Sequence, residues 1–267
     1  MVSSDPETDV NAQAISDPDS AAAEVTSDAL LGGRVRLYQP RHGYRVAIDP
    51  VLLAATVPVV RGDRVLDIGC GVGAASLCLA FREPGCRISG VEINRDLVRL
   101  AVENVTVNGM AGRIDVMLGD LVRPPSRLAP GSFHHAMANP PYLEDGRATP
   151  PPNAGKALAN IEGDARLGDW LRFGLMMVRP GGTVTLVHRA DRLDAVLAEL
   201  HGRAGGIVVY PLWPDRSHRP AKRVLIRAVK GSATPLRLAA GMVLHEPGGS
   251  YSEAAEQVLR YGAALPL

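Results

Sequence analysis

The sequence has almost no net charge and only three cysteines, and both shortages narrow the kind of protein it can encode. It carries 29 Lys and Arg against 28 Asp and Glu, a formal net charge of +1, so a nucleic-acid partner would have to be met by a local basic patch. Cys70, Cys78 and Cys86 lack the spacing of a metal site and cannot all pair with one another. These features predict a cytoplasmic protein without a metal.

Long hydrophobic runs are also lacking. No apolar stretch approaches the roughly 20 residues that span a bilayer, which argues against a membrane partner. The first 28 residues lack the basic start and the apolar core of a signal peptide. They are acidic, rich in Ser, Asp and Ala, and free of aromatic residues, so we predict a disordered acidic tail over residues 1–28.

The rest of the chain is apolar enough to form a large core, since 46% of the 267 residues are hydrophobic. Turn glycines and alternating polarity predict a hairpin over residues 32–49. Asp49 and Pro50 then suit the N-cap and the first position of a helix. We therefore predict an N-terminal hairpin and helix extension over residues 29–60 and one main domain over residues 61–267.

In the main domain, apolar strand-like runs alternate with helical patterns. Such alternation is typical of a mostly parallel sheet with helices on both faces. We predict a doubly wound, Rossmann-like α/β fold with a seven-stranded sheet. Its strands are predicted within residues 64–71, 87–94, 114–120, 133–142, 183–189, 206–213 and 223–230, and its helices within residues 74–82, 95–109, 169–182 and 192–203.

Polar residues or glycines follow four of these apolar runs, at residues 67–73, Glu92, Asp120 and Asn139. Ligands of such sheets bind beyond the carboxyl ends of the strands, near the point where the strand order reverses. The four positions are therefore expected to meet at one edge of the sheet and to form a binding site.

The turn "DIGCGVG", residues 67–73, lies between a predicted strand and a predicted helix. Its glycines let the backbone turn tightly and approach a ligand. Glu92 can accept both hydroxyls of a ribose, which also fits the pattern of an NAD site. Asp67 would repel a pyrophosphate but suits a positively charged ligand, such as S-adenosylmethionine with its sulfonium and ammonium groups. A strand–helix turn without a ligand is the structural alternative.

The segments "VLDIGCGVG", "GVEIN", "GD" and "NPPY" resemble class I S-adenosylmethionine-dependent methyltransferases, in particular the group that methylates planar nitrogens. The resemblance extends roughly from residue 31 to the C-terminus, and it implies S-adenosylmethionine as cofactor and S-adenosylhomocysteine as product. It places the methionine part of the cofactor at Asp67, Gly69 and Gly71. It also implies that Glu92 binds the ribose and that Asp120 approaches the adenine.

The motif "NPPY", residues 139–142, suits the activation of a flat amine. Acceptors on its two N–H bonds can draw the nitrogen toward a tetrahedral shape, so that the lone pair points at the sulfonium methyl. The side-chain oxygen of Asn139 and the carbonyl of Pro140, fixed by the double proline, can be these acceptors. Tyr142 offers a face for a stacked base. No general base is needed, because the methylated ammonium is acidic and can lose its proton to solvent, so catalysis would rest mainly on positioning; the alternative is a rigid turn.

The segments before and after these motifs distinguish the enzyme families that share the motifs. The stretches "GGRVRLYQPRHGYRVAIDPVLLAA" and "YPLWPDRSHRPAKRVLIRAVKG" resemble the bacterial family that methylates the adenine beside the anticodon of a valine tRNA. The resemblance implies RNA, most directly tRNA, as the partner and the adenine N6 amine as the methyl acceptor. The alternatives are a protein glutamine N5-methyltransferase and a catalytically silent S-adenosylmethionine-binding module that serves a partner.

Local basic residues support an RNA partner, although ordinary solvated surface charge is the alternative. The candidates for contact with RNA are Arg41, Arg45, Arg219, Lys222 and Arg223. Tyr44 and Asp49 are expected to close over the methionine end of the cofactor, with helix capping as a second account of Asp49. The oligomeric state is left open, a homodimer included.

Overall fold

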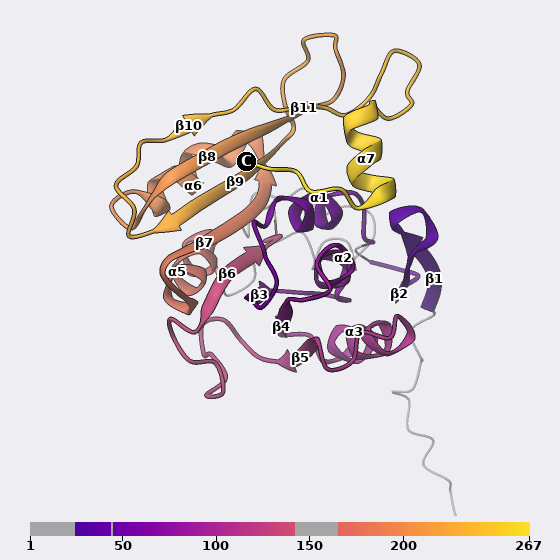
Figure 1. Ribbon diagram of the computed structural model, residues 1–267, viewed down its shortest axis with the longest axis vertical. Coiled ribbons are helices and arrows are strands. Elements are labelled where there is room, and N and C mark those ends of the chain that lie inside the picture. Colours follow the sequence, from indigo (N-terminus) through magenta and orange to yellow (C-terminus); the bar gives the residue numbers. More distant parts are fainter. Residues whose placement is uncertain (1–24, 44, 142–164) are drawn as a thin grey trace, which may run out of the picture.

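A mostly parallel sheet forms the centre of the computed structural model, which describes residues 25–43, 45–141 and 165–267 (Figure 1). The strand order is β10-β8-β9-β7-β6-β3-β4-β5, with β11 beside β8. The strands are β3 Arg64–Ile68, β4 Arg87–Glu92, β5 Ile114–Leu118, β6 Phe133–Ala138, β7 Val178–Arg189, β8 Ala204–Trp213, β9 Arg223–Lys230, β10 Arg237–Leu238 and β11 Met242–Val243. Strands β3 to β7 run parallel, and β9 is antiparallel to β7 and β8. The predicted doubly wound α/β fold is confirmed.

The sheet contains the seven predicted strands and two short ones that were not predicted. β10 and β11 have two residues each and pair in parallel with β8. Two residues cannot show the alternation by which a strand is recognised, so the predicted number of strands is too small by two. The strand β7 also begins earlier than predicted, at Val178, because Pro180 and the two glycines after it cannot continue a helix.

Helices cover both faces of the sheet, as Figure 1 shows. They are α1 Asp49–Thr56, α2 Ala74–Arg82, α3 Arg95–Val107, α5 Leu167–Met177, α6 Leu193–Leu200 and α7 Glu253–Tyr261. Alternate residues of β3 point to opposite faces. Val65 joins a core cluster with α1, α2, α3 and α7, whereas Leu66 joins one with α5 and α6. None of these described helices is long and apolar enough to cross a membrane.

The N-terminal hairpin lies farther upstream than predicted. It consists of β1 Val25–Leu30, the short helix η1 Leu31–Gly33 and β2 Val35–Pro40, which is antiparallel to β1. Asp28 in β1 accepts hydrogen bonds from Gln39 Nε2 at 2.9 Å and from Arg45 Nη2 at 2.8 Å. These side-chain bonds hold a strand that is too polar to stand out in the sequence. The prediction that the tail extends to Asp28 is therefore wrong for residues 25–28, and the hairpin predicted over residues 32–49 is shifted.

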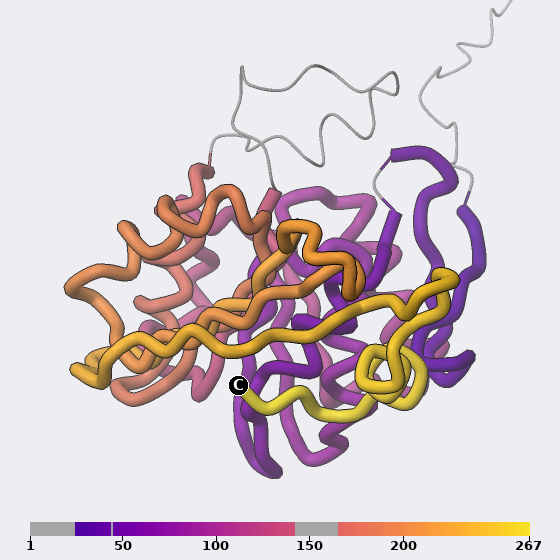
Figure 2. Tube along the Cα trace, turned by 90° about the horizontal axis from the view of Figure 1, so that it is seen from above, coloured from indigo at the N-terminus to yellow at the C-terminus, as the bar shows by residue number. Residues whose placement is uncertain are grey.

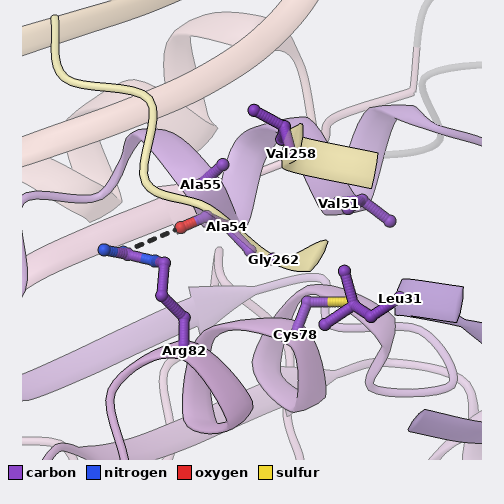
Figure 3. Close-up of a pocket in the computed structure, with 8 residues that line it drawn as sticks. All are labelled: Leu31, Val51, Ala54, Ala55, Cys78, Arg82, Val258 and Gly262. Atoms are coloured by element: carbon purple, nitrogen blue, oxygen red, sulfur yellow. Dashed lines mark hydrogen bonds between the residues drawn. The ribbon is translucent and has the colours of Figure 1, made fainter. Parts of the chain in front are cut away.

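The C-terminal helix α7, which was not predicted, packs against η1 and α1 (Figure 2). It begins after Ser252, whose Oγ accepts the N–H of Ala255 at 3.2 Å, and ends before Gly262, which has φ of 72°. A cavity of about 10 Å³ lies where α7, η1, α1 and α2 meet, and Arg82 donates to the Ala54 carbonyl beside it at 3.0 Å (Figure 3). A space of this size holds at most one water, so it is a packing gap and no ligand site.

A buried polar cluster lies at the amino edge of the sheet, opposite the expected site. His135 Nδ1 lies 2.8 Å from Thr183 Oγ1, and His135 Nε2 lies 3.1 Å from Asp63 Oδ2. Burial lowers the pKa of His135, although Asp63 acts in the other direction. Burial tends to raise the pKa of Asp63, but hydrogen bonds from the Val60 N–H and from His135 outweigh it and lower that pKa.

We expect acid to destabilise the protein through this cluster. The unfolded chain binds a proton at His135 near about pH 6.5 and the folded chain only at lower pH, so the free energy of unfolding falls as the pH drops below that value. Asp63 loses its contribution at still lower pH, below its unfolded pKa of 3.8. Thermal melts followed by circular dichroism should show a shallower fall in Tm between about pH 6.5 and 5 for His135→Asn than for the parent chain. Parallel profiles would contradict this assignment.

Candidate active site

The structure brings the predicted strand-end residues to the carboxyl edge of the sheet. The strands β5, β4, β3 and β6 are neighbours and run parallel, so the segments that follow them meet at one edge. Asp67 is in β3, Glu92 is the last residue of β4, and Asn139 directly follows β6. Asp120 lies just beyond β5, where the N–H of Gly119 donates to the carbonyl of Glu92 at 2.9 Å. These positions therefore share one edge, as the sequence predicts.

The turn between β3 and α2 needs glycine at three positions. Gly69, Gly71 and Gly73 have φ angles of 64°, 54° and 85°, a region that residues with side chains rarely adopt. Among the described residues, no atom lies within 4 Å of a Cβ built on Gly71. The backbone at Gly71 is therefore open to the approach of a ligand.

Glu92 is only 8% exposed, and each of its carboxylate oxygens is held by a backbone N–H. Oε2 accepts from Gly71 at 2.9 Å, and Oε1 accepts from Asn94 at 2.8 Å. Burial raises the pKa of Glu92, and these two hydrogen bonds act against that rise. Each oxygen keeps a further lone pair, so the carboxylate can still accept the two hydroxyls of a ribose. The predicted ribose acceptor is thus tied directly to the glycine turn.

Asp67 lies beneath the turn and away from its surface. The residue is 2% exposed, and its Oδ2 accepts the hydroxyl of Ser76 in α2 at 2.6 Å. Burial raises the pKa of Asp67 to about 7, and the neighbouring Glu92 acts in the same direction. Asp67 is therefore only partly charged at neutral pH. It would repel a pyrophosphate less than the sequence analysis assumed, so this residue is weaker evidence against an NAD site. Asp67 anchors α2 through Ser76, and its direct contact with the cofactor stays a prediction.

Two exposed apolar side chains near Asp120 were not predicted as site residues. Ile93, directly after Glu92, is 68% exposed, and Val122 is 52% exposed. Asp120 is held in a turn, because its Oδ1 accepts the N–H of Val122 at 2.8 Å. Apolar side chains beside fixed carboxylates suit a flat purine and its ribose, so this end of the site fits an adenosine. The signal in the sequence is the isoleucine between Glu92 and Asn94, at the end of a strand.

Trp170 of α5 packs directly on the glycine turn, a contact that no sequence pattern predicted. A Cβ built on Gly69 would lie 2.4 Å from Cη2 and 2.6 Å from Cζ3 of the Trp170 ring. The indole Nε1 is shielded from solvent and has no hydrogen-bond partner among the described residues. Position 69 therefore requires glycine for two separate reasons, its backbone conformation and this ring.

We expect Gly69→Ala to weaken S-adenosylhomocysteine binding by about tenfold or more, since a residue forced into the left-handed region costs about 1–3 kcal/mol before any clash is added. Gly131→Ala is the matched control, because Gly131 has a similar φ of 69° and a Cβ there would meet nothing within 4 Å among the described residues. Adding Trp170→Ala to Gly69→Ala should restore part of the affinity. Isothermal titration calorimetry decides it, and equal Kd values for the two glycine variants would contradict the role of the ring.

The structure describes Asn139 and Pro140 of the predicted target site. Asn139 is half-buried and Pro140 is buried. The turn that they form lies beside the glycine turn, because β6 pairs with β3 up to the last residue of each strand. Tyr142 and Tyr44 lie outside the described residues, so the stacking face and the cover over the methionine end stay predictions.

His188 is a further buried residue at this edge that was not predicted. The strands β6 and β7 pair up to Ala138 and Leu186, so Pro140 and His188 each lie two residues beyond that pair. Burial lowers the pKa of His188 to about 4, and Arg192 acts in the same direction. The imidazole is therefore neutral at pH 7 and adds no positive charge beside the place where a sulfonium would lie.

Asp49 does not cap α1, so the capping prediction is wrong. The N-cap is Ile48, and Asp49 is the first helical residue, whose Oδ2 accepts from Arg223 Nε at 3.1 Å. Arg223 begins β9 at the carboxyl edge of the sheet. The ion pair joins the start of α1 to that edge, and the long-range partner explains why this side chain does not fold back onto its own helix.

The predicted RNA contacts lie in two places. Arg41 and Arg45 follow the N-terminal hairpin, whereas Arg219 and Lys222 lie in the loop between β8 and β9. That loop is at the carboxyl edge, because β8 has the same direction as β7. Three of the five candidates form ion pairs, namely Arg45 with Asp28, Arg219 with Asp215 and Arg223 with Asp49. Contact with RNA stays a prediction for all five.

The three cysteines are buried free thiols. Burial raises the pKa of Cys78 to about 12 and that of Cys86 to about 11, and it raises the pKa of Cys70 well above its usual value. Protonated, buried thiols are poor nucleophiles. Among the described residues, no three His, Cys, Asp or Glu side chains are grouped in a way that could hold a metal ion.

Comparison with known sequences supports a methyltransferase. The Methyltransferase small domain family matches residues 45–157. The tRNA1(Val) (adenine(37)-N6)-methyltransferase of Aeromonas hydrophila is 31% identical over 219 residues, which cover 80% of this chain and 87% of that protein. The rRNA N(6)-adenosine-methyltransferase of Caenorhabditis elegans is 25% identical over 164 residues, which cover 61% of this chain and 69% of that protein.

Solved structures agree with this assignment. A predicted O-methyltransferase from Agrobacterium tumefaciens superposes with a TM-score of 0.68 at 25% identity, covering 82% of this chain and 99% of that one. An S-adenosylmethionine-dependent O-methyltransferase from Thermotoga maritima, with a TM-score of 0.51 at 18% identity, covers 71% of this chain and 67% of that one and is similar in fold alone. The predicted S-adenosylmethionine cofactor is confirmed by these findings, and NAD has no support among them. The chain belongs to the family of class I, S-adenosylmethionine-dependent tRNA1(Val) adenine-N6-methyltransferases.

Proposed function

We propose that this protein transfers the methyl group of S-adenosylmethionine to the N6 amine of an adenine in RNA, and that the RNA is a tRNA. Relatives named for adenine-N6 methylation of tRNA and of rRNA support the reaction, and the more similar ones support tRNA. The observation that carries the proposal is the arrangement of the sheet edge. A carboxylate bound to a glycine turn, Glu92, lies there together with the rigid turn formed by Asn139 and Pro140.

The residues at this edge fit the cofactor. The carboxylate of Glu92 would accept the ribose hydroxyls, and the open backbone at Gly71 would approach the methionine part, with Gly69 and Asp67 shaping the turn beneath it. The exposed face of Ile93 would cover the adenine. S-adenosylmethionine supplies an electrophilic methyl group on a positively charged sulfur.

The role of the Asn139 turn is to hold and polarise the amine. The side-chain oxygen of Asn139 would accept one N–H of the adenine amine, and the carbonyl of Pro140 would accept the other. The nitrogen lone pair then points away from both acceptors, toward the methyl group. The cofactor would supply the methyl group there, with the new N–C bond replacing the broken C–S bond, and the proton of the methylated nitrogen would leave to water. Catalysis rests on orientation and on acceptors fixed in advance, with Tyr142 as the proposed stacking partner of the base.

Glutamine in a protein is the alternative acceptor, because its amide presents a similar edge to the same two oxygens. The choice of adenine rests on the relatives, which are named for adenine in RNA. A third account, a silent cofactor-binding module, has less support because Asn139 and Pro140 are in place beside the glycine turn.

The proposal is tested with purified protein and S-adenosylmethionine that carries a labelled methyl group. Unmodified tRNA and a peptide-chain release factor serve as separate acceptors. We expect label in tRNA alone, recovered as N6-methyladenosine after digestion to nucleosides. Label on a glutamine of the release factor and none on RNA would overturn the proposal in favour of the glutamine enzyme. Tight cofactor binding without transfer to either acceptor would favour the silent module.

The basic residues complete the proposal for the RNA partner. Arg219, Lys222 and Arg223 would line the carboxyl edge, and Arg41 and Arg45 would flank the hairpin side of the site. Lys222 and Arg41 are exposed. The oligomeric state stays open, a homodimer included, and a cytoplasmic location stays a prediction from the sequence.

A further inference from the structure

A second hollow lies at the carboxyl edge of the sheet, apart from the cofactor turn. Its volume is about 630 Å³. One wall is the loop between β8 and β9, with residues 214–217, 219 and 222, and the other is the segment after β11, residues 245–249. Figure 1 shows both segments as loops that project from the same end of the molecule, near the label of β11. A hollow of this size can take part of an extended ligand.

The two walls are fastened to each other by specific contacts. Arg216 in the first wall donates from Nε and Nη2 to the two carboxylate oxygens of Glu246 in the second, at 3.1 and 3.0 Å. The N–H and the Nδ1–H of His245 both donate to the carbonyl of Pro214, at 3.1 and 3.0 Å. The ring of Tyr251 stacks on His245 with 5.0 Å between the ring centroids. The hollow is therefore a built feature of the fold and depends on the C-terminal segment.

The lining of the hollow carries more positive than negative side chains. Arg216, Arg219 and Lys222 oppose two carboxylates, Asp215 and Glu246. Arg219 holds the pKa of Asp215 well below its usual range, and the hydrogen bonds from Arg216 lower the pKa of Glu246, so both carboxylates stay ionised and leave an excess of cations.

The ion pairs in the hollow are open to exchange. The side chains of Arg216 and Arg219 are 64% and 61% exposed, and pairs this exposed contribute little to stability, so an arginine can turn from a carboxylate to a phosphate at small cost. His218, in the same loop, has φ of 61°, a conformation that residues with side chains adopt mainly where the surrounding structure imposes it. The loop is thus held in a defined shape with its cations at the surface.

We propose that this hollow binds the phosphodiester backbone of the RNA substrate, at nucleotides that flank the target adenine. The inference rests on the proposed function and adds to it the place where the strand is held. From β6, which leads to Asn139, to β8 there are three strand spacings, about 14 Å. At about 3.4 Å per stacked nucleotide, this separation corresponds to about four nucleotides of an RNA strand.

Backbone contacts at this distance would position the RNA without reading its sequence. The loss of such a contact should therefore raise the KM for RNA and leave the maximal rate and the cofactor affinity unchanged. The contact should also make binding sensitive to salt, because each phosphate that is neutralised releases counterions.

The test compares variants of the hollow in binding to a tRNA transcript over a range of salt concentrations. Lys222→Ala and Arg216→Ala should each weaken binding by about three- to tenfold and reduce the slope of log K against log salt by about one. Arg179→Ala is the matched control, since Arg179 is an exposed arginine near the start of β7, at the amino edge, and its loss should change neither quantity. Retained S-adenosylhomocysteine affinity and Tm show that each variant is folded.

A second pair of variants separates contact with phosphate from the fastening of the loops. Glu246→Gln removes the carboxylate that holds Arg216 but keeps the cation. If Arg216 contacts phosphate, this variant should bind RNA as well as the parent chain or better, whereas a purely structural ion pair would make it as weak as Arg216→Ala. Matched losses in these two variants would overturn the inference.

Two further outcomes keep the inference separate from the proposed function. An unchanged salt slope in Lys222→Ala and Arg216→Ala, with RNA methylated normally by the parent chain, would overturn the inference and leave the function intact. A parent chain that methylates no RNA would overturn the function itself.

A competition experiment tests which ligand occupies the hollow. Adenosine monophosphate is added at millimolar concentration as a competitor, and we expect it to displace little RNA. Full displacement would overturn the inference and point to a free nucleotide as the occupant.

Discussion

Replacing Asn139 with alanine is expected to lower the rate constant of methyl transfer by about 10²–10³, the usual effect of removing one fixed electrostatic partner from an active site. The substitution removes the side-chain oxygen but leaves Pro140, β6 and the glycine turn in place, so the affinity for S-adenosylhomocysteine should stay within about twofold of the parent value. RNA affinity should change less than the rate, because the acceptor matters most when the amine becomes tetrahedral.

Single-turnover methylation of a tRNA transcript measures this rate constant directly. Asn139→Asp is the informative companion, because a carboxylate keeps an acceptor oxygen at the same position and should retain more activity than alanine. Ser132→Ala, in the turn before β6, leaves the site untouched and should methylate at the parental rate. An Asn139→Ala protein with the parental rate would reduce the motif to a rigid turn.

Replacing Glu92 with alanine is expected to weaken cofactor binding by about 1.5–3 kcal/mol, roughly 10- to 150-fold, the scale of lost charge-assisted hydrogen bonds. Part of this loss comes from the turn itself, because the two carboxylate oxygens also hold the N–H groups of Gly71 and Asn94. Glu92→Gln keeps one acceptor oxygen and should lose less. Glu103→Ala, which removes an exposed carboxylate of α3, is the matched control and should bind as the parent does.

The same carboxylate predicts a pH dependence. Burial raises the pKa of Glu92 above its usual 4.5, so the group loses its charge at a higher pH than an exposed glutamate does. Calorimetry should therefore show cofactor affinity declining in mild acid, before the fold melts. In Glu92→Gln this decline should be absent, and an unchanged decline would assign the proton to another group.

Local patterns predicted the elements that carry strong local signals. The bounds of α2 and β9 agree with the prediction, because apolar periodicity and clear breaks define each of them. The strand β1 and the two-residue strands were missed, since side-chain hydrogen bonds from Gln39 and Arg45 or pairing with a neighbour stabilise them, and neither cause leaves a local pattern. A sequence pattern predicts the structure of its own segment and does not identify the segments that it contacts.

In the candidate site, too, the residues with a local sequence signal were predicted and the contacts with distant segments were not. Glu92 and Asn139 were identified because each ends a strand of a parallel sheet, and the topology then brings them to one edge. The ring of Trp170 on Gly69 and the pairing of Arg223 with Asp49 join segments more than 100 residues apart, so no spacing rule could reveal them. The ion pairs of Arg45 with Asp28 and of Arg219 with Asp215 were not predicted either, although these partners lie close in the sequence.

The most direct measurement is mass spectrometry of nucleosides from the purified tRNA and rRNA of the source organism, with and without a functional copy of the gene. RNA adenine-N6 methylation predicts that N6-methyladenosine in the tRNA fraction falls when the gene is deleted, returns with the intact gene, and does not return with a copy that carries Asn139→Ala. Unchanged N6-methyladenosine in every RNA fraction of the deletion strain would contradict it.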